Sequence, residues 1–207
     1  VPTGNFGNIL AAYYAKNLGV PIAKLICASN DNKVLYDFFQ TGTYDKNREF
    51  VLTTSPSMDI LISSNLERLI YLICGEDSEK TKELMEELKT TGKYTITPEM
   101  KEKLADFAAG YSTEEETAES IHDTYQKTGY VMDTHTAVAA HVCGQYRAKS
   151  GDQTKCVIAS TASPYKFVKS VMSAIDAENA NADEFDLLPK LQEVSGVPMP
   201  QAIKDIL

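Results

Sequence analysis

The stretch VPTGNFGNILAAYYAKNLGVPIAKLICAS, residues 1–29, decides the fold of this chain of 207 residues. Its apolar and small residues at positions 9, 10, 12, 13 and 15 predict a buried helix over Asn8–Asn17, which Gly19 and Pro21 end. Ile22–Ser29 is a short apolar run rich in β-formers, which predicts a parallel strand. The chain therefore begins with a loop, a helix and a strand.

The segments that follow continue the same rhythm. Asn30-Asp31-Asn32 is expected to cap a second helix that runs to about Gln40 and stops at Gly42. Phe50–Thr54 and Lys155–Ser160 are two further strand candidates. Helices alternating with buried strands are typical of a doubly wound, mostly parallel sheet, so the sequence predicts the α/β class.

A different region, Glu76–Lys127, is acidic and helically periodic, and it is expected to be mainly helical and peripheral. One apolar stripe consists of Met100, Leu104, Phe107, Ala108 and Tyr111, and another of Ala118, Ile121 and Tyr125. Thr97-Pro98-Glu99 and Ser112–Glu116 are expected helix starts. The sequence thus divides into an α/β part at 1–75, an acidic helical insertion at 76–128, and a return to the α/β domain with a helical tail at 129–207.

The loop at 3–8, TGNFGN, is the candidate phosphate site. Glycine and asparagine tolerate backbone conformations that turn several N–H donors toward one point at the start of a helix, where an anion is favoured. The loop lacks the Lys-Ser/Thr of a P-loop and the spacing of a dinucleotide fingerprint. From the residues alone, a tight strand-to-helix turn is the alternative.

Composition excludes several classes of partner. The 20 basic and 29 acidic residues give a net charge of −9, which disfavours nucleic acid and anionic membranes. No apolar run reaches the length of about 18 residues that a bilayer span needs. The four cysteines have no CxxC spacing and lie apart from the histidines in sequence, so we expect reduced thiols in a cytoplasmic protein and no metal site.

Five short motifs resemble the threonine synthase family, and they occur in the family's order. They are VPTGNFGN at 1–8, LICASND at 25–31, SPSMDI with SNLERL at 55–69, DTHTA at 133–137 and STASPYKF at 160–167. The chain departs from the family patterns at Thr3, Thr134, Ser163 and Tyr165. The change at Ser163 replaces a histidine, so no histidine role is carried over to that position.

The resemblance implies a fold-type II enzyme that uses pyridoxal 5′-phosphate (PLP) to convert O-phospho-L-homoserine and water to L-threonine and phosphate. It implies that Gly4, Asn5, Phe6, Gly7 and Asn8 cradle the cofactor phosphate. Thr161 would meet the pyridine nitrogen, with Ser160 as the fallback, at the end of the expected strand. A helix N-cap is the alternative role for these two hydroxyls.

The resemblance also suggests substrate contacts at Ser55, Ser57, Asp59 and Lys166. Asp59 could equally be a structural cap, and Lys166 a solvated surface residue. His135 fits the first turn of a helix better than the role of a base.

The family's Schiff-base lysine lies in an FKD-like motif of its N-terminal half, and no lysine here has that context. The resemblance therefore implies a C-terminal fragment that is inactive by itself and has the missing N-terminal half as its partner. The chain's start, directly before a loop that normally follows a strand, favours the same interpretation. Three alternatives stay open: a related PLP dehydratase, a noncatalytic phosphate-binding α/β module, and an acidic interaction protein.

Overall fold

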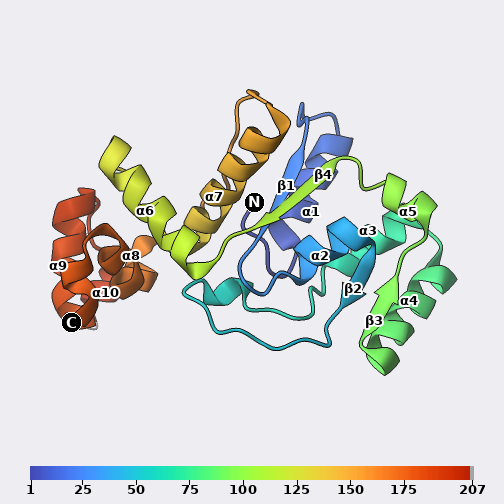
Figure 1. Cartoon of the computed structure of the whole chain (residues 1–207), viewed down its shortest axis with the longest axis horizontal. Coiled ribbons are helices and arrows are strands. Elements are labelled where there is room, and N and C mark those ends of the chain that lie inside the picture. The colour runs from blue at the N-terminus through green and yellow to red at the C-terminus, as the bar shows by residue number, and fades with distance from the viewer. Residues whose placement is uncertain (206–207) are drawn as a thin grey trace.

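A computed structural model describes residues 1–205 (Figure 1). Its elements up to the last strand are α1 (Gly7–Asn17), β1 (Leu25–Ser29), α2 (Val34–Thr41), β2 (Thr43–Asp45), η1 (Pro56–Met58), α3 (Leu66–Ile73), α4 (Ser78–Thr91), β3 (Lys93–Thr95), α5 (Pro98–Glu102) and β4 (Phe107–Tyr111). The remaining elements are α6 (Glu114–Thr128), α7 (Thr134–Ser150), η2 (Pro164–Phe167), α8 (Val168–Ile175), η3 (Ala177–Asn181), α9 (Glu184–Ser195) and α10 (Gln201–Lys204).

The central sheet is parallel, which confirms the predicted α/β class. Strand β1 pairs with β4 in the register Leu25↔Phe107 to Ser29↔Tyr111, and the two lie side by side in Figure 1. On the other edge of β1, Pro2 forms a parallel bridge to Ala28. The loop after Pro2 therefore leaves at the carboxyl end of the sheet, where open α/β sheets bind ligands.

The predicted helices at the start of the chain are confirmed. Helix α1 covers the expected residues, and α2 ends at Gly42, whose φ of 81° provides the left-handed C-cap. The expected cap of α2 is wrong: its N-cap is Lys33, without a side-chain hydrogen bond. The side chains of Asn30 and Asn32 instead donate to the Asp59 carboxylate, and these bonds hold the loop that contains Asp59.

Strand β4 corrects the prediction for region 76–127. The apolar stripe from Met100 to Tyr111 predicts a helix, but α5 ends at Glu102 and Phe107–Tyr111 is a strand of the central sheet. A Cβ at Gly110 would lie 2.7 Å from Cγ1 of Val142, so glycine allows α7 to pack closely on the strand. The region also forms β3, which pairs antiparallel with β2. It is mostly helical but not all peripheral, and the three-part division of the chain stays a prediction.

Both expected helix starts in this region are present. Thr97 accepts a hydrogen bond from the Met100 N–H at the start of α5. Thr113 and Glu116 form a capping box at the start of α6.

The other two strand predictions are wrong. In segment 50–54, backbone groups bond to side chains instead of a ladder: the Val51 N–H donates to Asn32, and the Thr53 N–H donates to Asp59. Segment 155–160 is irregular, and no strand within residues 1–205 pairs with it. Its Val157 is 84% exposed. A strand needs a ladder partner, which an apolar run cannot reveal by itself.

Two main apolar cores divide the interior. One joins α1, the sheet and α2–α5 through buried side chains such as Phe6, Phe38 and Leu69. The other holds α6–α9 together around Val168 and Leu187, at the opposite end of the molecule in Figure 1. No helix within residues 1–205 combines the length and apolar character that crossing a bilayer requires.

Candidate functional site

A cavity of about 260 Å³ lies at the N-terminus of α1, at the carboxyl end of the sheet. Its lining comes from five separate parts of the chain: Pro2, Thr3, Gly4, Asn5, Phe6, Gly7 and Asn8, then Ser57 and Met58, then Asn65, then His135, and finally Thr161. The whole predicted phosphate loop therefore faces one space. The fold brings His135 and Thr161 to that loop from more than 100 residues away in sequence.

The start of α1 leaves backbone donors available to this cavity. Its N-cap is Phe6, which has no side-chain acceptor, whereas α4, α6 and α7 begin with an Asp or Thr that caps the first turn. The first N–H groups of a helix have no partner within the helix. The positive end of α1 is thus suited to an anion.

Phe6 anchors this loop in the core. Its φ of 62° places the backbone in the left-handed region, and its side chain is 1% exposed. The ring lies 6.1 Å from Phe39 and 6.0 Å from Phe107. Burial of the ring offsets the strain of this backbone conformation. The sequence predicts glycine or asparagine, and not phenylalanine, at a left-handed position of the loop. Phe6 therefore contributes backbone, not its ring, to the cavity wall.

Gly4 is needed for close packing and not for a positive φ. A Cβ there would lie 2.7 Å from the Ser57 carbonyl oxygen and 2.9 Å from Cα of Met58. Ser63 also donates from its hydroxyl to the Gly4 carbonyl. The loop is therefore clamped between two segments that the sequence places more than 50 residues downstream.

His135 lies in the first turn of α7, as the sequence indicates, and its Nε2 accepts a hydrogen bond from the Ser57 N–H at 3.2 Å. Its Nδ1 lies 3.4 Å from Oδ1 of Asp133, the N-cap of α7. Burial by itself would raise the pKa of Asp133, but hydrogen bonds from His135 and Thr136 outweigh it and hold the pKa below its usual value. An ionised Asp133 favours the proton on Nδ1, which leaves Nε2 free to accept.

Of the two hydroxyls that the resemblance suggests for the pyridine nitrogen, Thr161 lines the cavity and Ser160 does not. The Ser160 hydroxyl accepts a hydrogen bond from Oγ1 of Thr136 at 3.0 Å. Neither residue is a helix cap, since Ser163 caps η2 by accepting from the Tyr165 N–H. The segment that carries Ser160 and Thr161 is irregular, so no strand end delivers them.

Three of the four suggested substrate contacts do not line the cavity. Ser55 is fully buried and accepts from Asn30. Asp59 accepts four hydrogen bonds, from the side chains of Asn30, Asn32 and Thr53 and from the Thr53 N–H, which favours its structural role. Lys166 is exposed, with Nζ 5.6 Å from the centre of the Phe167 ring. Ser57 does line the cavity.

Sequence reasoning missed Asn65 and Met58 as lining residues. Both belong to motifs that carry the family resemblance, SNLERL and SPSMDI. The motifs indicated that these segments belong to the site. The residues next to Met58 and Asn65 in sequence do not indicate which side chains of the motifs face the loop.

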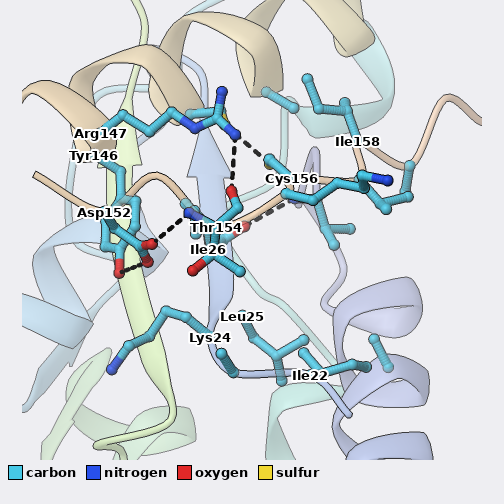
Figure 2. Close-up of a pocket in the computed structure, with 18 of the residues that line it drawn as sticks. Ile22, Lys24, Leu25, Ile26, Tyr146, Arg147, Asp152, Thr154, Cys156 and Ile158 are labelled. Carbon is cyan, nitrogen blue, oxygen red and sulfur yellow. Dashed lines mark hydrogen bonds between the residues drawn. The ribbon is translucent and has the colours of Figure 1, made fainter. Parts of the chain in front are cut away.

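A second cavity, of about 370 Å³, is larger but lacks a converging set of donors (Figure 2). Leu25, Ile26 and Ile158 form apolar parts of its wall, and Arg147 donates to the Thr154 carbonyl at 2.8 Å. Asp152 in turn accepts from the Thr154 N–H at 2.8 Å and from the Tyr146 hydroxyl at 3.2 Å, so these polar groups bond to one another. It also holds Cys143 and Cys156, two of the four free cysteines. The smaller cavity, which the whole loop at 3–8 lines, is therefore the candidate site.

Within residues 1–205, no three His, Cys, Asp or Glu side chains form a group that could hold a metal ion.

Comparison with known proteins supports the family resemblance. The family described as "Threonine synthase, C-terminal" matches residues 136–206. Threonine synthase-like 1 of Macaca fascicularis is 42% identical over 200 residues, which are 96% of this chain and 26% of that protein. The PLP-bound threonine synthase from Brucella melitensis has a TM-score of 0.79 at 42% identity, over 84% of this chain and 37% of that one. This chain is related to the threonine synthases.

The yeast threonine synthase structure extends this similarity, with a TM-score of 0.82 and 36% identity over 95% of this chain. The chain spans only 42% of that yeast chain, and about a quarter of the macaque relative. The five motifs thus identified the threonine synthase relationship correctly, and the fold of this chain matches the corresponding part of the solved threonine synthases.

Proposed function

We propose that the protein carrying this chain is a PLP-dependent threonine synthase that converts O-phospho-L-homoserine and water to L-threonine and phosphate. One observation carries the proposal: the TGNFGN loop and Thr161, separated by about 150 residues, line the same cavity in a chain related to threonine synthases. The solved Brucella relative is described as PLP-bound, which supports the same cofactor here.

The residues of the cavity fit a phosphate monoester at one end. The N-cap of α1, Phe6, makes no side-chain hydrogen bond to the first turn, so the N–H groups of that turn are available at the loop. Each charge-assisted hydrogen bond from such a group to a phosphate is worth about 1.5–3 kcal/mol. Gly4, Asn5, Gly7 and Asn8 surround that end. PLP supplies an electron sink when bound, and that chemistry belongs to the cofactor.

Two further residues of this chain contact the ligands: Thr161 contacts the cofactor, and Ser57 contacts the substrate. Thr161 provides a neutral hydroxyl to the pyridine nitrogen, which does not hold a proton there as a carboxylate does. Ser57 sits on the wall next to Gly4, where it can contact substrate. Ser160 orients Thr161 through its bond to Thr136, and Ser55, Asp59 and Lys166 support or surround the site without lining it.

Covalent attachment and proton transfer are assigned to a residue outside these 207. Among residues 1–205, no lysine lines the cavity. We therefore propose that the N-terminal part of the protein supplies the lysine, and that this chain alone binds PLP weakly and does not turn over. The free cysteines fit a cytoplasmic location, which we include in the proposal.

A second candidate is a PLP lyase acting on a different phosphorylated amino acid. The observation that favours it is the similarity to a protein named threonine synthase-like, at 42% identity. The phosphate cradle would be the same in both cases, and only the substrate would differ.

The deciding experiment is an assay of the full-length protein with PLP. Release of inorganic phosphate from O-phospho-L-homoserine, with stoichiometric L-threonine, is the expected result. Phosphate release from a different phosphorylated amino acid, with none from O-phospho-L-homoserine, would favour the second candidate. No reaction with any phosphorylated amino acid, although PLP is bound, would reject both enzyme assignments.

A further inference from the structure

Two asparagine side chains at the cavity have their carbonyl oxygens already occupied. Oδ1 of Asn5 accepts from the Ser64 N–H at 2.6 Å and from the Ser64 hydroxyl at 2.8 Å. An amide whose oxygen accepts two hydrogen bonds has only its NH₂ group left for another partner. Asn5 therefore presents donors, and not an acceptor, to whatever occupies the cavity.

Asn65 is oriented in the same way by a different residue. Its Oδ1 accepts from the Arg68 guanidinium, three residues further along α3. Its Nδ2 points at the loop, since a Cβ at Gly7 would lie 3.2 Å from that atom. Asn65 itself lines the cavity. A side chain at position 7 would displace this amide, so Gly7 leaves room for Nδ2 at the start of α1.

We propose that Asn5 and Asn65 form an oriented amide pair, which donates from Nδ2 of each residue to a phosphate group at the start of α1. Ser64 and Arg68 are positioning residues, because each fixes an amide through its oxygen. The phosphate as ligand rests on the proposed function, while the donor orientation follows from the contacts themselves.

The pair explains how a cavity without a lining Lys or Arg can select a dianion. A phosphate monoester is an acceptor at all three free oxygens, and helix N–H groups and amide NH₂ groups are donors only in this arrangement. Arg68 polarises the Asn65 amide from outside the cavity, as charged partners strengthen hydrogen-bond chains. A ligand without the phosphate group gains nothing from the pair.

The test is Asn65→Asp in the full-length protein, which keeps the shape and replaces the donor by a carboxylate. We expect the Kd for PLP and for inorganic phosphate to rise at least about tenfold, equivalent to about 1.4 kcal/mol. The Kd for pyridoxal, which lacks the phosphate, should stay unchanged. Arg68→Met should weaken PLP and phosphate binding several-fold, and the exposed neighbour Glu67→Gln is the matched control.

Two results would overturn the oriented amide pair: wild-type affinity for both PLP and phosphate in Asn65→Asp, or an equal loss for pyridoxal. These outcomes are separate from failure of the proposed function, which the turnover assay decides. If the wild-type protein binds neither PLP nor inorganic phosphate, the pair has no phosphate to hold and the inference is rejected directly.

Discussion

The Ser57 N–H donates to Nε2 of His135 across 3.2 Å and joins two segments 78 residues apart. This bond fixes the loop whose carbonyl packs on Gly4. His135→Leu removes the acceptor of the part-buried Ser57 N–H, a hydrogen bond worth about 0.5–1.5 kcal/mol. His135→Gln can place an oxygen near the same position. We expect PLP affinity, measured by fluorescence titration of the full-length protein, to fall more for Leu than for Gln. Equal affinities would show that the bond does not position the loop.

Gly4→Ala should destabilise the protein and weaken PLP binding together. The new Cβ would meet the Ser57 carbonyl oxygen at 2.7 Å, and overpacking of this kind costs about 1–3 kcal/mol. Gly144→Ala in α7 is the matched control, because a Cβ there meets nothing within 4 Å. Removing a glycine from a helix interior stabilises it by about 0.5–1 kcal/mol. Urea unfolding measures both variants. A Gly4→Ala protein as stable as wild type would contradict the close packing.

Thr161→Val keeps the side-chain shape and removes the hydroxyl from the cavity. We expect turnover of the full-length enzyme to fall more than PLP content, because the phosphate contacts remain. Ser160→Ala should have the smaller effect, since Ser160 only accepts from Thr136. Steady-state kinetics and cofactor absorbance give the two readouts. A silent Thr161→Val beside a crippled Ser160→Ala would reverse the assignment.

Asp59→Asn should destabilise the fold by about 2–4 kcal/mol, because two buried asparagines and Thr53 all donate to this carboxylate. An amide presents an NH₂ group to donors and leaves at least one unpaired. Asp31→Asn is the control, as no hydrogen bond of the Asp31 carboxylate occurs in the described part of the chain. Its effect should stay within about 0.5 kcal/mol. Chemical denaturation of both variants measures the two effects. Similar unfolding midpoints for Asp59→Asn and Asp31→Asn would refute the structural role of Asp59.

Cys143 and Cys156 should form an intramolecular disulfide under diamide. Their Sγ atoms lie 2.9 Å apart, and a disulfide needs about 2.05 Å. The half-buried Cys156 is reached first, and diamide takes up the two hydrogens. Cys27 should stay a thiol, because burial raises its pKa to about 12. Peptide mapping should show a linked pair 2 Da lighter than the two free thiols. A linkage involving Cys27 would contradict the geometry.

The sequence by itself determined the features that depend on local periodicity and short motifs. Helix α1, strand β1 and the end of α2 at Gly42 followed from apolar spacing and helix-ending residues. The motifs also gave the family and the loop at the start of α1. These signals are local, because a helix bonds within itself and a cap lies within a few residues of it.

Only the tertiary structure decided which segments pair. Phe107–Tyr111 continues a helical apolar stripe in sequence, yet it becomes the strand beside β1, because Gly110 admits α7 and the strand edge offers a ladder. Segment 50–54 has strand composition, yet Asn32 and Asp59 take its hydrogen bonds. Likewise, Asn65 and His135 reach the loop at 3–8 only through contacts distant in sequence. A hydrogen-bond partner many residues away leaves no mark on the pattern of its own segment, so periodicity cannot reveal it.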